Sequence, residues 1–329
     1  MASFSNFGND LYTGKRSFDI VGRRKLWFTI AIIAIAASIV VPFVRGGFQF
    51  GIEFRGGSEF QVSQPKNLDQ SIAVDSVKSV VGNVTPRVSI VNGGDSIRVQ
   101  TDQLTSTESD NIRDALAAGY HVSVKKVTSS FIGATWGADI TRQALTALVT
   151  FIILAAIIMA LYFRTWKMSI AALVALLHDL VITAGVYGIL GFEVTPAAVI
   201  GFLTILGYSL YDTVVVFDKI RENTNEGSGR TFAASVNLAV NQTLVRSINT
   251  SVVALLPVGS ILFIGAYVLG AGTLRDISLA LFIGILAGTY STIFIAAPLY
   301  STLRQNETIV QRTDKKKVGA SARVSGAVR

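Results

Sequence analysis

The sequence predicts a polytopic α-helical membrane protein with six transmembrane helices and an α+β domain between the first and second helices. Half of the 329 residues are apolar and only 15% are charged. Several apolar runs approach or exceed the roughly 20 residues that an α-helix needs to span hydrocarbon. Between the first two runs the hydropathy falls, and short alternating segments replace the long apolar ones.

The chain starts with a polar, basic segment. Residues 1–25 end in a cluster of lysine and arginine, and residues 26–44 form the first apolar run. A cleaved signal peptide is the competing interpretation. Its apolar core would be shorter and a small-residue cleavage site would follow, whereas Pro42 and residues 45–47 (Arg-Gly-Gly) stand here. We therefore expect an uncleaved helix with its basic end in the cytoplasm.

Residues 46–142 have the pattern of a water-soluble domain. Phe60 and Val62 alternate with polar residues and indicate a half-buried strand. Two further strands are expected on either side of a turn at residues 92–95, with apolar positions at Val88, Ile90, Ile97 and Val99.

Two helices and a last strand complete this domain. Apolar residues at helical spacing mark the helices, at Val74, Val77 and Val81 and at Ile112 and Leu116. Gly119 is placed to end the second helix, and residues 122–124 are expected to form the last strand. The order β-α-β-β-α-β is that of a ferredoxin-like split βαβ unit.

Five more apolar runs follow, at residues 143–163, 168–190, 196–217, 247–269 and 277–303. Basic residues gather at 164–167, at 219–246 and in the tail 304–329, while the turn at 191–193 has none. The positive-inside rule then places both termini in the cytoplasm and the α+β domain outside it. The basic tail is expected to be disordered and drawn to anionic lipid.

The composition excludes several classes of function. The chain has no cysteine, which excludes disulfides and cysteine-ligated metals, and its two histidines, His121 and His178, stand far apart without an HExxH pattern. No P-loop or GxSxG motif is present, so we expect neither an enzyme nor a cofactor. The basic residues lie beside membrane runs, which favours a membrane explanation over nucleic-acid binding.

Asp212 is the main candidate functional residue because it lies well inside the fourth apolar run. An ionised carboxylate near a bilayer centre costs about 2.5–3.5 kcal/mol, so it is expected to face protein or water and to have a partner. The alternative is a snorkelling charge or a hydrogen bond that only joins helices. Asp218 already supplies the boundary charge, which favours a carboxylate that takes up and releases protons. Tyr208, one turn earlier, is predicted to hydrogen-bond it.

Arg246 is the candidate partner of Asp212. Residues 231–245 have the pattern of an amphipathic helix on the cytoplasmic surface, and Arg246 stands where this segment is expected to turn into the fifth run. The alternative is an ordinary positive-inside flanking residue. His178 and Asp179, in the middle of the third run, are a second ionisable pair. A structural hydrogen bond and a proton relay remain equally open for that pair.

At these residues the sequence resembles a known family. GYSLYDTVVVFDKIREN is similar to the signature of the SecF subunits within the SecD/SecF family of bacterial protein export. GIEFRGGSEF, HDLVITAG and NQTLVRSINTS also match in order and spacing, and the first of these includes Gly51, Phe54, Gly56 and Gly57. The chain departs from the family pattern at Glu53, Trp136 and Tyr211.

The resemblance covers about residues 16–303, and it implies membership of the resistance-nodulation-division superfamily. Asp212 would be the membrane carboxylate of proton coupling and Arg246 the functional arginine of the fifth helix. The six helices would form half of a bundle in the bacterial cytoplasmic membrane, with SecD on a separate chain as the other half.

The expected partners of that half-bundle are the SecY/SecE/SecG channel, a translocating polypeptide, membrane lipid and protons, and the expected role is the use of the proton motive force in late translocation. The alternatives are half of a proton-coupled small-molecule or lipid exporter, and a non-transporting scaffold of the channel.

Overall fold

The structure is a computed structural model that describes residues 2–82, 84–91, 95–225, 230–265 and 272–306. Within these ranges, six helices are long and apolar enough to cross a membrane. Their cores are α2 (Arg24–Val44), α6 (Ala134–Phe163), α7 (Trp166–Leu190), α8 (Pro196–Asn225), α9 (Phe232–Ser260) and α10 (Gly272–Ser291). A five-residue π-helical segment, Thr292–Ala296, joins α10 to α11 (Ala297–Arg304). The predicted architecture of six apolar helices with a small sheet domain is confirmed.

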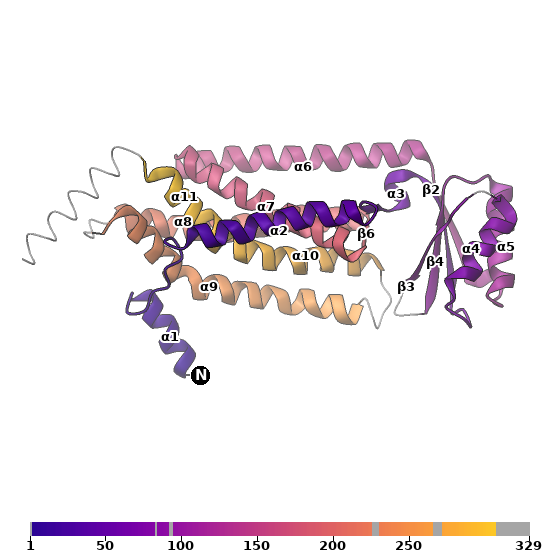
Figure 1. The fold of residues 1–329 in the computed structure, drawn as a ribbon, viewed down its shortest axis with the longest axis horizontal. Helices are drawn as coiled ribbons and strands as arrows, with labels where there is room; N and C mark the ends of the chain where they lie inside the picture. The colour runs from indigo at the N-terminus through magenta and orange to yellow at the C-terminus, as the bar shows by residue number, and fades with distance from the viewer. Residues whose placement is uncertain (1, 83, 92–94, 226–229, 266–271, 307–329) are drawn as a thin grey trace, which may run out of the picture.

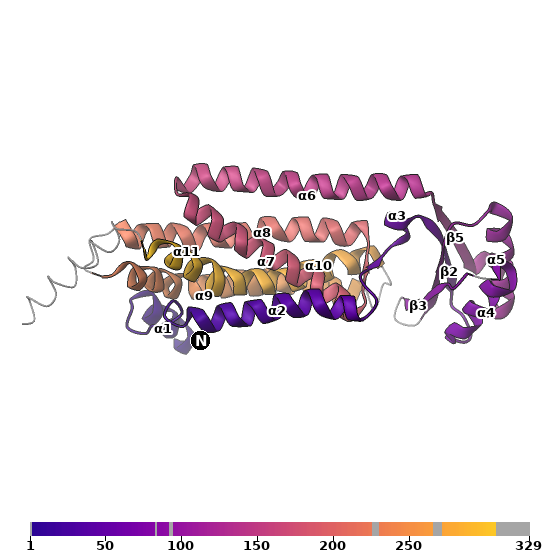
Figure 2. The same cartoon turned by 45° about the horizontal axis from the view of Figure 1, so that its top comes forward.

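The helices lie side by side in a long bundle, with the sheet domain at one end (Figure 1). The N-terminal helix α1 (Ala2–Tyr12) and α11 lie at the opposite end, which we call the distal end of the bundle. Helix α6 runs the length of the bundle from the sheet domain, along one side of the other helices (Figure 2). The two ends of the described chain are therefore both remote from the sheet.

The sheet domain has a four-stranded antiparallel sheet in the order β3-β4-β2-β5. Its elements are β2 (Gly57–Ser63), α4 (Gln70–Val81), β3 (Arg87–Val91), β4 (Ser96–Thr101), α5 (Ser106–Gly119) and β5 (Val127–Ile132). Phe60 and Val62 are fully buried, which confirms the predicted half-buried strand. The predicted pair of strands is also confirmed, because Val88 lies opposite Val99 and Ile90 opposite Ile97. The predicted turn falls mostly on residues 92–94, outside the described residues.

Local capping explains where the two domain helices begin. Asp69 accepts a hydrogen bond from the backbone N–H of Ser71, and this bond lowers the pKa of the Asp69 carboxyl. Thr105 and Glu108 form a reciprocal capping box at the start of α5. Helix α5 ends at Gly119, close to the predicted stop.

The predicted last strand was wrong by a few residues. Residues Val124–Lys126 form a short 3₁₀ helix, and the strand runs over Val127–Ile132. Its burial pattern explains the error: only Val127 is buried, so the strand lacks the apolar alternation that marks the others.

Close helix contacts depend on small residues, as expected of membrane bundles. A Cβ on Gly284 would lie 2.2 Å from Ile205, and a Cβ on Gly185 would lie 2.1 Å from Ser38. These glycines bring α10 against α8 and α7 against α2. Gly207 differs, because nothing lies within 4 Å of its Cβ position.

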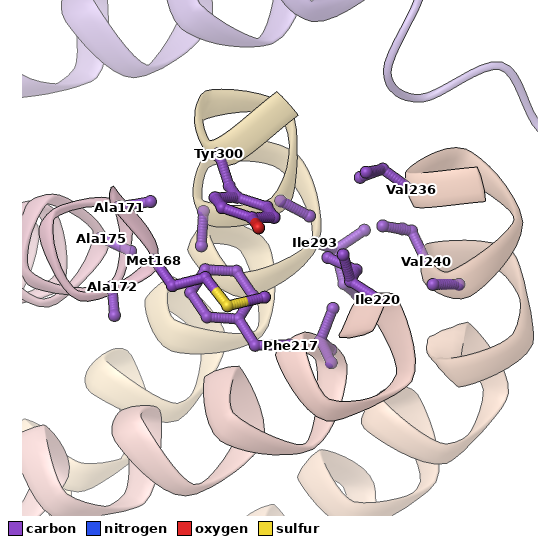
Figure 3. Close-up of a cluster of buried hydrophobic side chains, with 14 of the residues drawn as sticks. Met168, Ala171, Ala172, Ala175, Phe217, Ile220, Val236, Val240, Ile293 and Tyr300 are labelled. Carbon is purple, nitrogen blue, oxygen red and sulfur yellow. The ribbon is translucent and has the colours of Figure 1, made fainter. Parts of the chain in front are cut away.

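A core of apolar side chains joins α6, α7, α8 and α9 to the π-helical segment and α11 at the distal end (Figure 3). Phe217 of α8 packs against Tyr300 of α11, with ring centroids 5.7 Å apart. Around them lie Met168, Ala171, Ala172, Ala175, Ile220, Val236, Val240 and Ile293. This core fixes α8 against α9 a little more than one turn beyond Asp212.

The segment between α1 and α2 is tied to α9 by two asparagines. Asn241 both accepts a hydrogen bond from the backbone N–H of Phe18, at 2.7 Å, and donates one to its carbonyl, at 2.9 Å. Asn237 accepts from the backbone N–H groups of Ile20 and Val21. The N-terminal segment, expected from sequence only to be polar, is thus an ordered part of the distal end.

Candidate functional site

Asp212 lies on α8 and faces α9. Its side chain is buried, and its Oδ1 accepts a hydrogen bond from Ser247 Oγ at 2.9 Å. Its Oδ2 is buried with no hydrogen-bond partner among the described residues. Unpaired buried polar atoms are rare in native proteins and point to a site completed by something else. Asp212 is therefore a half-satisfied carboxyl group inside the bundle.

Arg246 is adjacent to Ser247 on α9, yet it does not pair with Asp212. No hydrogen bond or ion pair joins the two side chains in the described part of the chain, and Arg246 is exposed. Arg246 instead lines a cavity of about 420 Å³ at the distal end, together with Tyr12, Val215, Asp218, Lys219, Glu222, Gln242 and Thr243. Asp212 and Arg246 therefore lie near each other, because Ser247 bonds to Asp212 and is next to Arg246 in the chain. Their side chains do not form the predicted pair.

The predicted turn at Arg246 was wrong. Helix α9 runs without a break from Phe232 to Ser260, so the expected surface helix at residues 231–245 and the fifth apolar run are one helix. The polar residues around Arg246 are compatible with a helix because their hydroxyls bond to its own carbonyls. Thr250 donates to the carbonyl of Arg246, and Ser251 to that of Ser247.

The predicted hydrogen bond from Tyr208 to Asp212 is absent. The Tyr208 hydroxyl is buried and has no partner among the described residues. Long side chains on a helix lean toward its N-terminus, so the ring carries the hydroxyl away from Asp212 although both residues share a face.

His178 and Asp179 lie at a junction of three helices. His178 Nδ1 is 3.0 Å from Asp179 Oδ1, within the same helix, α7. Asp179 Oδ2 accepts hydrogen bonds from Ser209 Oγ of α8 at 2.5 Å and from Ser291 Oγ of α10 at 2.8 Å. The contacts between helices thus run through two serines that sequence reasoning did not single out. In the sequence, the only feature that could have indicated these two serines was a hydroxyl side chain within a long apolar run.

Two further hydroxyl pairs join neighbouring helices of the bundle. Thr213 of α8 lies 2.9 Å from Thr292, and Ser251 of α9 lies 2.5 Å from Thr289 of α10. Buried polar side chains therefore line the contacts from Asp179 to Asp212, in a part of the bundle that is otherwise apolar.

The motif glycines lie where the sheet domain joins the bundle. Gly56 and Gly57 have φ of +73° and +138°, and a Cβ on Gly57 would lie 2.4 Å from the carbonyl oxygen of Thr101. The N–H of Gly51 donates to the carbonyl of Val194, extending the parallel pairing of β1 (Gln49–Phe50) with β6 (Glu193–Val194). Phe54 belongs to the short helix α3 (Ile52–Arg55), which packs on the start of α6. The structure thus gives this motif a backbone-packing role.

Charged side chains reinforce this junction. Arg98 forms ion pairs with Glu193 at 3.0 Å and with Glu59 at 3.5 Å, and Gln100 donates to both carboxylates. Burial raises the pKa of the Glu53 carboxyl, and the neighbouring charges of Glu193 and Glu59 raise it further.

Comparison with known proteins decides the family. Residues 112–306 match the family model described as protein export membrane protein SecD/SecF, C-terminal. The chain belongs to the SecD/SecF family. It is 44% identical to the protein translocase subunit SecF of Streptomyces coelicolor, over 96% of this chain and 84% of that protein. It is 43% identical to the SecF of Mycobacterium tuberculosis H37Rv, over 94% of this chain and 72% of that protein.

A solved SecD/SecF-family structure has the same fold. The crystal structure of SecDF from Thermus thermophilus, described as a translocon-associated membrane protein, superposes with a TM-score of 0.77 at 28% identity. The match covers 88% of this chain but only 39% of that one, so this chain spans well under half of SecDF. The matched stretch of this chain, residues 112–306, contains Asp212, Arg246 and the His178–Asp179 pair.

Proposed function

We propose that this chain is a protein-export accessory subunit of the SecF type, which together with SecD uses the proton motive force to promote late steps of polypeptide translocation. The observation that carries this proposal is the state of Asp212: one oxygen accepts a hydrogen bond from Ser247, and the other is buried without a partner among the residues described. An unpaired carboxylate oxygen inside a membrane bundle is where a proton can bind at low cost.

The proton-coupling step uses Arg246 as the alternating partner. When Asp212 is protonated, it is neutral and Arg246 stays in its polar cavity at the distal end. When the proton leaves, the carboxylate attracts the guanidinium, and α8 and α9 are drawn together. One charge that crosses 100 mV releases about 2.3 kcal/mol, several times thermal energy. That energy is enough to bias a two-state rearrangement of helices.

The partner chain completes the bundle. SecD is expected to supply the other half of a pseudo-symmetric membrane domain, as the much longer SecDF relative suggests. Exposed apolar side chains such as Leu161, Val253 and Leu256 give this chain lipid-facing or partner-facing surfaces. The SecY/SecE/SecG channel and the emerging polypeptide are the further partners.

The proposed location is the bacterial cytoplasmic membrane, with both chain ends in the cytoplasm. The sheet domain then lies outside the cytoplasm. Its antiparallel order β3-β4-β2-β5, with α4 and α5 as the crossovers, supports a ferredoxin-like unit. Movement in the bundle would reach it through the β1–β6 pairing and the Arg98 ion pairs.

For Asp179 we propose a role in helix packing and not in the relay of protons. Both of its oxygens are occupied by His178, Ser209 and Ser291, which leaves no unpaired atom for a transferred proton. The occupied oxygens favour helix packing over a proton relay, the two interpretations that the sequence left open.

Replacement of Asp212 by Asn tests the proposed function. The amide keeps the shape and the acceptor for Ser247 but cannot exchange a proton, so the variant should assemble with SecD normally and lose proton-dependent export in membrane vesicles. Asp139→Asn, at an exposed carboxylate on α6, is the matched control and should export normally. Normal export by Asp212→Asn would leave only a scaffold role, and failure to recover SecD with the protein would reject the half-bundle.

A further inference from the structure

An apolar cavity lies between the membrane helices at the end that carries the sheet domain. Its volume is about 320 Å³, and its walls come from α3, α6, α7 and α8 and from the paired strands β1 and β6. Apolar side chains make up most of the lining, chiefly Phe54, Leu145, Leu148, Leu180, Val199 and Phe202. Leu145 is 58% exposed, so the cavity opens on the outer surface of the bundle, beside α6. In a membrane this opening faces lipid.

The cavity offers almost nothing to a polar ligand in its interior. Thr141 contributes the one hydroxyl among its lining residues, and that hydroxyl already donates to the carbonyl of Gly137 at 2.9 Å. A polar group placed inside would lose its hydration without finding a partner. The occupant of the interior is therefore hydrocarbon.

One cationic side chain lines the rim. Arg55 is exposed, and its Nε donates to the carbonyl of Phe50 at 3.0 Å, which fixes the start of the guanidinium group at the cavity. Its remaining N–H groups have no ion pair or hydrogen bond to any part of the chain that the structure describes. A guanidinium fork of this kind matches the geometry of a phosphate group.

We propose that this cavity binds an anionic phospholipid, with an acyl chain among the apolar side chains and the phosphate on Arg55. The two parts of the site, a dry apolar interior and a fixed cation at its rim, match the two parts of such a lipid. A membrane helix of another chain would fill the apolar part equally well, but its apolar surface would leave the guanidinium without an anion. Charge complementarity therefore selects the lipid.

The test compares lipid retention by purified full-length variants. The protein is delipidated in detergent, loaded with phosphatidylglycerol or with the zwitterionic phosphatidylcholine, and examined by native mass spectrometry. Arg55→Gln should lower phosphatidylglycerol retention about tenfold, a change of the size expected for one charge-assisted contact. Arg142→Gln, which removes an exposed arginine from α6 that does not line the cavity, should leave retention unchanged.

A second variant tests the cavity separately from the charge. Ala144→Leu places additional volume inside the cavity while Arg55 remains, and it should also lower retention. An unchanged unfolding midpoint shows that the variant is folded; should it unfold, Leu148→Met probes the same wall at nearly constant volume and should alter the preference for acyl-chain length.

Several outcomes would overturn the proposal. Equal retention in Arg55→Gln and Arg142→Gln would mean annular lipid only. Displacement of the lipid by inorganic phosphate would mean a free-anion site without an acyl chain in the cavity. A second polypeptide that co-purifies and excludes the lipid from the unaltered protein would mean that the cavity is a protein interface.

Discussion

Two aspartates lie deep in the membrane helices, and they differ in how fully they are satisfied. Asp179 is 0% exposed and Asp212 is 7% exposed, so burial does not separate them. Asp179 has partners on both oxygens, from His178, Ser209 and Ser291. Asp212 has Ser247 on one oxygen, and its other oxygen has no hydrogen-bond partner in the ranges that the structure describes. The two sites therefore differ in the partners of the carboxyl group and not in its depth, and the proposed packing and titrating roles rest on that difference.

The difference follows from where the two residues lie in the bundle. Asp179 sits where α7, α8 and α10 meet, and Gly288 of α10 lets that helix approach its carboxylate closely. Two helices can then each contribute a hydroxyl. Asp212 lies at the contact of α8 with α9, where one hydroxyl reaches it. The remaining oxygen is available to a proton, to Arg246 or to a group from a partner chain.

The largest expected effect comes from removal of the two carboxyl groups in turn. Asp179→Ala should destabilise the protein by about 3 kcal/mol, because it leaves His178 and Ser209 without their described partner and leaves Ser291 only its longer bond to the carbonyl of Gly288. Asp212→Ala should cost about 1 kcal/mol, the value of one lost hydrogen bond. Denaturant-induced unfolding in detergent measures both. Equal losses in the two variants would remove the distinction between the sites.

Much of the fold and part of this distinction are predictable from the sequence. Long apolar runs require only length and composition, so all six membrane helices and the sheet domain were predicted. Asp212 was identifiable because an ionised carboxylate inside such an apolar run has a high free energy in a membrane. The hydroxyl partners were not predictable, since Ser209, Ser291 and Ser247 become partners only through the packing of separate helices. The position of Arg246 in the middle of a helix was missed because polar residues that bond to their own helix resemble a helix end.

A smaller effect is expected from the serines that complete the Asp179 site. Ser209→Ala and Ser291→Ala should each destabilise the protein by about 1–2 kcal/mol, since each removes a hydrogen bond to a buried carboxyl group. In the Asp179→Ala background Ser209→Ala should have almost no effect, because its partner is already gone, and Ser291→Ala should cost only its longer bond to the carbonyl of Gly288, at 3.2 Å. Effects that persist in that background would show that the serines stabilise the helices independently of Asp179.

Removal of the serine that bonds to Asp212 should lower the stability of the protein less than removal of the serines that bond to Asp179. Ser247→Ala removes the one side-chain hydrogen bond that Asp212 has within the described residues, and it should cost about 0.5–1.5 kcal/mol. Ser260→Ala, at an exposed serine of the same helix that bonds to the carbonyl of Leu256, is the matched control. A loss in Ser247→Ala as large as that in Asp179→Ala would mean that Asp212 is also a packing residue.

The smallest expected effect concerns a third carboxyl group, Glu53, which lies outside the membrane helices where bulk pH reaches it. Burial, together with Glu193 and Glu59, raises its pKa in the folded protein. The folded state therefore holds this proton more tightly than the unfolded chain, so the folded protein becomes less stable as pH rises from about 4.3, the ordinary glutamate value, through the raised value. Glu53→Gln should flatten this part of the stability profile and raise the unfolding midpoint at neutral pH.

Unfolding midpoints measured across acidic and neutral pH test this prediction, with Asp75→Asn, an exposed carboxylate on α4, as the control. An unchanged slope in Glu53→Gln would mean that Arg98 and Gln100 already compensate the three glutamates. The carboxyl groups of the junction would then resemble Asp179, because each would have a compensating partner. Asp212 would be the one incompletely hydrogen-bonded carboxyl group of the three sites compared.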